Sequence, residues 1–209
     1  MIKKTGVGTK ILSNLEYGSR LDILGPLGRP FRIYTETKKA FLVAGGIGLA
    51  PFYFLSRELL KRNTEVTLYW GIKNSEQIYL QGSNRAITAE FERIGTKVNI
   101  ACESGAKGFY KGLVTELFYN DLSRNSSSHK DTQIFSCGPY PMLKKIEEIS
   151  EEFSLDHQVL LEEKMACGVG ACQSCSFAGI SKKDKRREIK RVCVDGPVFN
   201  GEEIDWDAI

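Results

Sequence analysis

From residue 40 onward, hydrophobic and polar positions follow a pattern typical of strands that alternate with helices. Residues 40–44 form an unbroken apolar run, as expected of a parallel strand that is covered on both faces. Strand patterns follow at 65–71, 97–103, 132–137 and 157–162, and helical periodicity lies at about 50–62, 84–94, 113–120 and 141–153. This order predicts an α/β fold with a doubly wound, five-stranded parallel sheet that binds ligands at the carboxyl ends of its strands.

The first 35 residues have a different pattern of hydrophobic and polar positions. Short apolar stretches at 11–12 and 21–24 are separated by turn residues, including Gly25-Pro26-Leu27-Gly28. This pattern predicts two or three short antiparallel strands, which are too few to close a barrel or to bury a core by themselves. We therefore expect three parts: a partial β segment (1–35), the parallel-sheet domain (36–162) and a small third module (163–209).

The third module begins rich in glycine and cysteine and then becomes strongly charged. Residues 181–191 include seven basic and two acidic side chains, a local net charge of +5. They are interpreted as a solvated hairpin between Cys175 and Cys193, with a docking patch for an acidic partner as the alternative. A polar stretch at 125–128 predicts a loop before the fourth strand.

Composition limits the class of protein. The 209 residues are 42% hydrophobic and 26% charged with a net charge of +3, which suits a folded core and gives no indication of nucleic-acid binding. No run approaches the roughly 18 apolar residues of a membrane span, and the charged N-terminus lacks the apolar stretch of a secretory signal. We expect a soluble cytoplasmic protein with neither a nucleic-acid nor a membrane partner.

Four of the six cysteines follow a spacing that indicates a metal centre. Cys167, Cys172 and Cys175 share one loop as C-x4-C-x2-C, and Cys193 follows after 17 intervening residues. Three thiols in one loop and a distant fourth match the plant-type [2Fe–2S] pattern, in which each iron needs two thiolates. A structural zinc site is the alternative, although zinc modules usually supply two separated cysteine pairs. A [2Fe–2S] centre passes one electron at a time, so these residues predict an electron carrier.

Two further motifs follow predicted strands. Gly45-Gly46-x-Gly48-x-x-Pro51 lies between the first buried strand and a helix, where glycines let the backbone approach a pyrophosphate. Such a turn also serves simple packing. Cys137-Gly138-Pro139-Tyr140-Pro141-Met142 ends the fourth strand, where this kind of sheet binds its ligands, but Cys137 can equally be a small buried residue.

Taken together, these motifs resemble the ferredoxin-reductase superfamily. Within it, the chain is similar to the iron–sulfur electron-transfer subunits of class 1B dihydroorotate dehydrogenase. The similarity runs over essentially the whole chain and rests on Gly8-Thr9, Gly25-Pro26-Leu27-Gly28, Gly45-Gly46-Ile47-Gly48, Cys137-Gly138-Pro139-x-Pro141-Met142, Glu162-Glu163-Lys164-Met165-Ala166-Cys167-Gly168-Val169-Gly170-Ala171-Cys172 and Val192-Cys193-Val194-Asp195-Gly196-Pro197-Val198-Phe199.

The resemblance implies the cofactors and the reaction. NADH would reduce FAD, and a [2Fe–2S] cluster would relay single electrons to FMN on a catalytic dihydroorotate dehydrogenase subunit in pyrimidine biosynthesis. It implies a heterotetramer or homodimer, and NADH rather than NADPH as substrate. The residues expected to bind cofactors are Gly8 and Thr9 for FAD, Gly45, Gly46, Gly48, Pro51, Cys137, Gly138, Pro139 and Met142 for the nucleotide, and Cys167, Cys172, Cys175 and Cys193 for the cluster.

One part of the family pattern is not found in this chain. The Arg-Pro-x-Ser or Arg-x-Tyr-Ser strand motif that holds FAD in relatives is absent from the sequence. Residues 1–35 therefore read as a truncated flavin barrel, and we expect the isolated chain to bind FAD weakly. Two alternatives remain: a related subunit of a sulfide dehydrogenase or of an NADH-dependent ferredoxin:NADP oxidoreductase, or a non-enzymatic cluster carrier without flavin.

Several other residues have simpler interpretations. Glu103 could hold a ligand at the end of the third strand or merely form a loop. Tyr69 and Trp70 are expected in the core, while His129 and His157 are expected to be structural or on the surface. No arrangement of nucleophile and base is evident, and hydride relay requires none.

Overall fold

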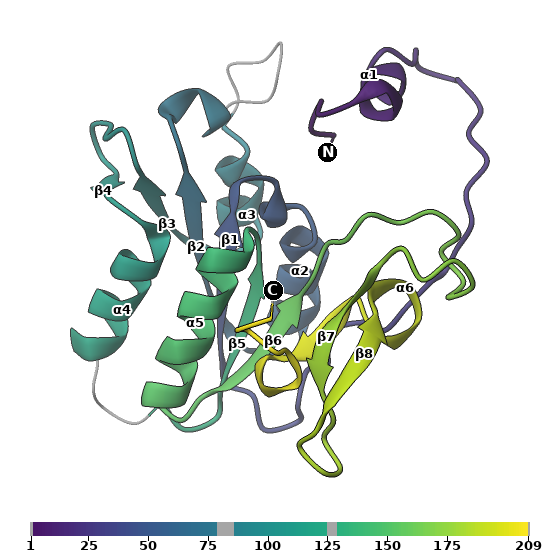
Figure 1. Cartoon of the computed structure of the whole chain (residues 1–209). Helices are drawn as coiled ribbons and strands as arrows, with labels where there is room; N and C mark the ends of the chain where they lie inside the picture. Colours follow the sequence, from purple (N-terminus) through teal and green to yellow (C-terminus); the bar gives the residue numbers. More distant parts are fainter. Residues whose placement is uncertain (1, 79–85, 125–128, 209) are drawn as a thin grey trace.

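A computed structural model describes residues 2–78, 86–124 and 129–208 of the chain. Its centre is a seven-stranded sheet with the strand order β4-β3-β2-β1-β5-β6-β9 (Figure 1). The strands are β1 (Lys39–Gly45), β2 (Glu65–Ile72), β3 (Lys97–Cys102), β4 (Tyr110–Lys111), β5 (Thr132–Cys137), β6 (Asp156–Leu160) and β9 (Val198–Asn200). All five expected parallel strands are present, and the doubly wound order is confirmed.

Two of the seven strands were not predicted. β4 extends one edge in parallel with β3, and β9 pairs antiparallel with β6 at the other edge. β4 is only two residues long and β9 three, so neither shows an alternation long enough to recognise. Because β9 comes from the C-terminal segment, the main sheet is completed by residues that follow the cysteine loop.

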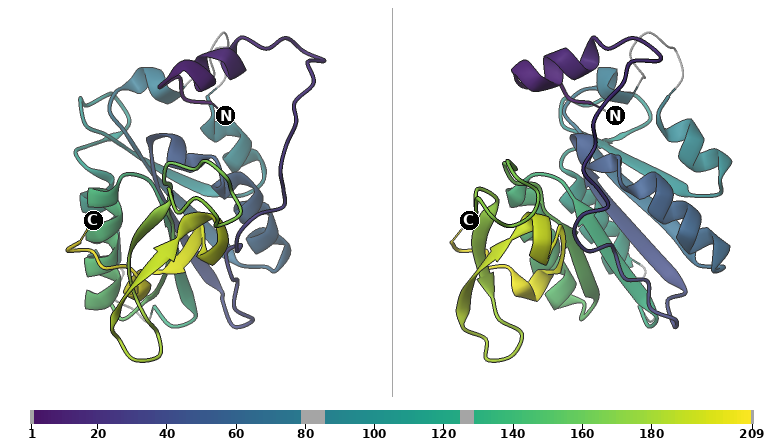
Figure 2. Two further views of the ribbon diagram at one scale, coloured as in Figure 1. Left: turned by 45° about the vertical axis from the view of Figure 1, so that its right-hand side comes forward. Right: turned by 90° about the vertical axis from the view of Figure 1, so that its right-hand side faces the viewer.

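Helices cover both faces of the sheet (Figures 1 and 2). One face carries α2 (Phe52–Lys61) and α3 (Thr88–Arg93), and the other carries α4 (Val114–Arg124) and α5 (Tyr140–Glu152). These agree with the four expected helices, although residues 84–85 of the expected 84–94 helix lie outside the described residues, as does the expected loop at 125–128. Short 3₁₀ turns η1 (Gly46–Leu49) and η2 (Ser75–Ile78) follow β1 and β2.

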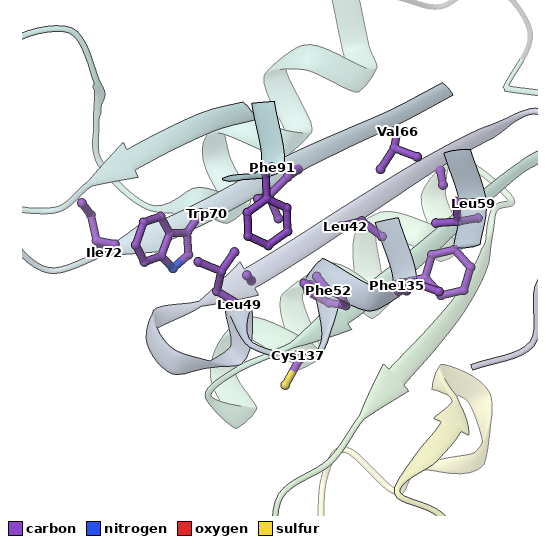
Figure 3. Close-up of a cluster of buried hydrophobic side chains, with 14 of the residues drawn as sticks. Leu42, Leu49, Phe52, Leu59, Val66, Trp70, Ile72, Phe91, Phe135 and Cys137 are labelled. Carbon is purple, nitrogen blue, oxygen red and sulfur yellow. The ribbon is translucent and has the colours of Figure 1, made fainter. Parts of the chain in front are cut away.

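The buried side chains form a core on each face of the sheet. Figure 3 shows the α2 side, where Leu42, Phe52, Leu59, Trp70 and Phe135 are all less than 3% exposed. Tyr69 belongs to the opposite core, against Phe118. The expectation that Tyr69 and Trp70 lie in the core is therefore confirmed.

The C-terminal segment forms a small unit beside β6. It contains the antiparallel hairpin β7 (Ser176–Ile180) and β8 (Arg187–Arg191), the single turn α6 (Val192–Asp195) and the 3₁₀ turn η3 (Gly201–Glu203). A third core joins this unit to the sheet domain, because Phe177, Val192 and Phe199 pack with Leu143 of α5 and Val159 of β6. The cysteine module is therefore supported by the sheet domain as well as by any metal that it holds.

The N-terminal segment differs from the expectation. Residues 2–28 form no strand; they contain α1 (Val7–Ser13), in which no residue is buried, and an extended arm along the outside of the molecule (Figures 1 and 2). The prediction of antiparallel strands in residues 1–35 is wrong, because a strand needs a hydrogen-bonded neighbour. In this stretch only Arg29 reaches one, through an isolated bridge to Pro197.

Candidate functional site

A cleft of about 810 Å³ opens at the carboxyl edge of the sheet. It lies where the strand order reverses, between β1 and β5, and the segments that follow these two strands form its floor. In open α/β sheets the loops diverge at this switch point and leave a crevice for a ligand. The topology alone therefore marks the cleft as the candidate ligand site.

The two predicted motifs meet on this floor. A Cβ atom added to Gly45 would lie 2.6 Å from Pro139 Cδ and 2.9 Å from the sulfur of Met142, so the glycine-rich turn and the turn after β5 are in close contact. The Trp70 indole N–H donates to the Gly46 carbonyl oxygen at 2.8 Å and fixes the turn from the side of β2. The sequence motifs thus form one continuous backbone surface.

Most of the residues expected to bind nucleotide line the cleft: Gly45, Gly46, Gly48, Gly138, Pro139 and Met142. Pro51 and Cys137 do not. Pro51 instead precedes α2, where a missing N–H costs nothing, and Cys137 is buried below the floor in the core drawn in Figure 3. Burial, followed by the nearby Glu162 carboxylate, raises the pKa of the Cys137 thiol to about 12, so it stays protonated.

Other lining residues were not singled out as nucleotide-binding. Gly71 ends β2 beside Gly45 of β1, and Thr115 lies in the first turn of α4. Glu103, Tyr140 and Glu162 also line the cleft. The position of Gly71 at a strand end was a usable signal, whereas Thr115 and Tyr140 reach the cleft only because of how α4 and α5 pack.

The four predicted ligand cysteines come together as two pairs. The Cys167 thiol interacts with that of Cys172, and the Cys193 thiol interacts with that of Cys175 and, more weakly, with that of Cys167. The second pair is buried, at 2% and 3% exposure, while Cys172 is exposed. Cys193 reaches Cys175 because β7 and β8 form a hairpin that returns the chain to the loop.

Backbone amides point at the sulfurs of the outer pair. Val169 and Cys172 donate N–H groups to Cys167 Sγ at 3.5 and 3.4 Å, and Ser174 donates to Cys172 Sγ at 3.5 Å. The amides of Cys172 and, next, Val169 lower the pKa of Cys167 to about 6. Gly168 and Gly170 allow this tight path because both have positive φ. The loop is thus built to hold negatively charged sulfur.

This arrangement suits a two-iron cluster better than a single ion. Among the described residues, no group of three or more His, Cys, Asp or Glu side chains is arranged to hold one metal ion. A four-cysteine zinc site would need all its ligands around one centre. In a [2Fe–2S] cluster each iron takes only two thiolates from the protein, so the observed pairs fit that group.

The charged segment 181–191 is largely neutralised within the module. Ion pairs join Lys182 and Lys190 to Glu203, Lys185 to Glu202, and Arg187 to Asp205. The segment forms the turn and second strand of the β7–β8 hairpin, as expected. These contacts favour a solvated structural hairpin over a docking patch for an acidic partner.

A buried chain of Ser, His and Glu side chains connects β5, β6 and α5. His157 Nε2 is 2.7 Å from Ser136 Oγ, and His157 Nδ1 is 2.6 Å from Glu147 Oε2. These distances match those of a nucleophile, base and acid, an arrangement that was not evident from the sequence. Ser136 is 0% exposed, so no substrate can reach it, and the chain ties α5 to β5 and β6. His157 is structural, as expected.

The expected FAD contacts lie on the N-terminal segment. Gly8 and Thr9 are part of α1, and Thr9 Oγ1 accepts the backbone N–H groups of Thr5 and Gly6 at 2.9 and 3.0 Å. A Cβ atom on Gly8 would meet nothing within 4 Å. Gly8 therefore faces open space, and these two residues enclose no ligand by themselves.

No helix among the described residues is long and apolar enough to cross a membrane.

The chain is similar to known families in both halves. A family described as "Iron-sulfur cluster binding domain of dihydroorotate dehydrogenase B" matches residues 162–205, and "Oxidoreductase NAD-binding domain" matches residues 42–148. The electron transfer subunit of dihydroorotate dehydrogenase B (NAD(+)) of Desulforamulus reducens is 37% identical over 207 residues, which are 99% of this chain and 74% of the relative. The same subunit of Fusobacterium nucleatum is 33% identical over 96% of this chain and 71% of its own length.

Solved structures agree with this assignment. A structure of an NADH-dependent reduced ferredoxin-NADP oxidoreductase, described for flavin-based electron bifurcation, superposes with a TM-score of 0.77 at 30% identity and covers 99% of this chain and 68% of the other. A flavohemoglobin of Malassezia yamatoensis superposes with a TM-score of 0.59 at 19% identity, over 76% of this chain and 42% of its own, and supports the fold alone.

Proposed function

Because this chain belongs to the family of the electron transfer subunits of dihydroorotate dehydrogenase B, we propose that it passes electrons from NADH to a catalytic partner subunit in pyrimidine biosynthesis. The observation that carries the proposal is the combination, in one chain, of a switch-point cleft and a paired-cysteine loop joined by a shared core. A carrier without nucleotide chemistry would have no use for the cleft.

The chain's own residues divide the work. The backbone of Gly45–Gly48 and Gly138–Pro139 binds the nucleotide and holds its reactive end at the cleft, and Cys167, Cys172, Cys175 and Cys193 hold the [2Fe–2S] cluster. When bound, FAD accepts the electron pair of a hydride and releases electrons singly, as the cluster requires. Gly8 and Thr9 supply backbone for part of the FAD site.

The partner subunit docks at the outer cysteine pair. Cys172 is exposed, and Met165 and Val169 of the same loop are 52% and 55% exposed, so the loop presents two apolar side chains to solvent. Short distance matters for electron transfer, and this face offers the nearest approach. We further propose that the partner carries FMN and forms a heterotetramer with this chain, and that both work in the cytoplasm, where free thiols persist.

The deciding experiment combines the chain with its partner. The protein, reconstituted with FAD and iron–sulfide, is mixed anaerobically with the catalytic dihydroorotate dehydrogenase subunit of the same organism. NAD⁺ reduction that depends on dihydroorotate and on both chains supports the proposal. A chain that instead couples NADH to ferredoxin and NADP⁺, with no response to that subunit, would assign it to the family of the ferredoxin-NADP oxidoreductase structure.

We predict that the chain binds NADH at least about tenfold more tightly than NADPH, because like charges placed together are costly. The Glu103 carboxylate lines the cleft and would repel a 2′-phosphate bound beside it, and the lysines of the lining are Lys3, Lys73 and Lys145. Fluorescence titration of both nucleotides measures the ratio. Glu103→Gln should narrow it, with Glu76→Gln, an exposed carboxylate outside the lining residues, as the control. Tighter binding of NADPH by the unaltered chain contradicts the preference.

We also predict that the isolated 209-residue chain binds FAD weakly and keeps its cluster during purification. In α1 no side chain is buried, and ordering an exposed segment around a ligand costs conformational entropy. The visible spectrum of anaerobically purified protein separates flavin bands from cluster bands. Stoichiometric FAD after gel filtration would show that residues 2–28 enclose the flavin in another way.

A further inference from the structure

Tyr140 stands between the nucleotide cleft and the cysteine loop. It is the first residue of α5, it lines the cleft, and its ring packs against the core shared with the C-terminal module. Its hydroxyl donates to Glu163 Oε1 at 2.6 Å. Glu163 lies four residues before Cys167, so this bond joins the cleft to the segment that leads into the loop.

The hydrogen bonds continue from Glu163 to a ligand cysteine. Glu163 Oε2 accepts the Lys164 N–H at 3.3 Å, and the Lys164 carbonyl accepts the Ser174 hydroxyl at 2.6 Å. Ser174 then donates its own N–H to Cys172 Sγ at 3.5 Å. A continuous chain of contacts therefore runs from a residue that lines the cleft to the outer cysteine pair.

We propose that Tyr140 is a positioning residue for the iron–sulfur loop, acting through Glu163 and Ser174 to hold the Cys172 side of the loop against the cleft. This rests on the proposed function in one respect, namely that the four cysteines hold a [2Fe–2S] cluster. It adds a residue outside the cysteine motif to the set that determines how the cluster behaves.

The exposure of the loop explains why such an anchor is needed. Residues 164–166 and 171–174 are exposed, so little apolar burial holds them in place. The N–H groups that point at sulfur stabilise the added negative charge of a reduced cluster and raise its potential. When the anchor is lost, these hydrogen bonds loosen and the potential falls.

The test compares the reduction potential and the electron paramagnetic resonance signal of the reduced cluster in variants of the full chain. Tyr140→Phe keeps the ring in its core and removes only the hydroxyl. We expect it to shift the g values and lower the potential, with full iron content. Ser174→Ala should shift the potential in the same direction.

Tyr119→Phe is the matched control. Tyr119, like Tyr140, donates its hydroxyl to a glutamate. Its acceptor is Glu152, at 2.9 Å, which lies at the C-terminal end of α5, whereas Tyr140 lies at the N-terminal end. The cluster of the Tyr119→Phe variant should have the same reduction potential and g values as that of the unaltered protein. The proposal is overturned if Tyr140→Phe leaves both quantities unchanged, or if Tyr119→Phe shifts them equally. Absence of a [2Fe–2S] signal in the unaltered chain would instead overturn the proposed function.

Discussion

A Cys193→Ala protein should lose nearly all of its iron, its visible cluster absorbance and the resonance signal of the reduced state. Cys193 is 3% exposed and pairs with Cys175, so its removal leaves one iron with a single protein thiolate. Because metal binding and folding are coupled, the exposed loop 164–174 should also become sensitive to proteases. Cys193 belongs to the core that joins the β7–β8 hairpin to the sheet domain, but Phe177 and Phe199 still pack there with Leu143, so the hairpin should remain.

Cys102→Ala is the matched control for this prediction. Cys102 is as buried as Cys193, but it lies at the end of β3 with Ser104 and the Lys73 carbonyl as its neighbours. It should keep full iron and sulfide content. If Cys193→Ala retains the cluster, or if metal analysis of the unaltered chain finds zinc without iron, the assignment of the four ligands is wrong.

Gly48→Ala should both destabilise the protein and close the cleft. An added Cβ would clash with the carbonyl oxygen and carbon of Cys137, which are backbone atoms of β5. These backbone atoms can move away only if β1 and β5 separate. Overpacking of this type lowers the free energy of unfolding by about 3 kcal/mol. Since the two turns form the cleft floor together, we also expect a loss of more than about tenfold in NADH affinity.

Gly46→Ala provides the comparison on the same turn. A Cβ at Gly46 would meet nothing within 4 Å, and only its φ of +55° opposes a side chain, at a cost of about 1 kcal/mol. Urea denaturation gives the free energy of unfolding of each variant, and fluorescence titration gives the affinity for NADH. Equal stability of the two variants would show that Gly48 does not lie against Cys137 in solution.

Much of the sheet domain could be predicted because its signals are local. The run 40–44 is apolar throughout since β1 is covered on both faces. β5 (132–137) is also buried along its whole length, although Thr132, Gln133 and Ser136 are polar. The helices could be predicted because their apolar residues recur with the helical period of 3.6 residues. Strands as short as β4 and β9 show no recognisable pattern of apolar residues. β9 joins the sheet only by pairing with β6, whose residues lie 38 or more positions earlier.

The N-terminal segment shows the opposite failure. Its apolar residues were interpreted as strands, yet Val7 and Ile11 lie on one helix and are 78% and 60% exposed. A strand depends on a neighbour that local sequence does not reveal, whereas a helix forms its backbone hydrogen bonds within its own segment. The interpretation therefore failed where the outcome depended on a partner strand.

The sequence by itself predicted the ligand set, because the spacing of Cys167, Cys172 and Cys175 restricts which thiols a short loop can direct at one cluster. Only the tertiary structure decided how these ligands pair, and that Gly48 lies against Cys137 and Tyr140 holds Glu163. The Cys175–Cys193, Gly48–Cys137 and Tyr140–Glu163 contacts each join residues more than 15 positions apart along the chain. Such contacts depend on the packing of α5, β5 and the C-terminal hairpin. The pattern of hydrophobic and polar residues in one segment does not predict where another segment will lie.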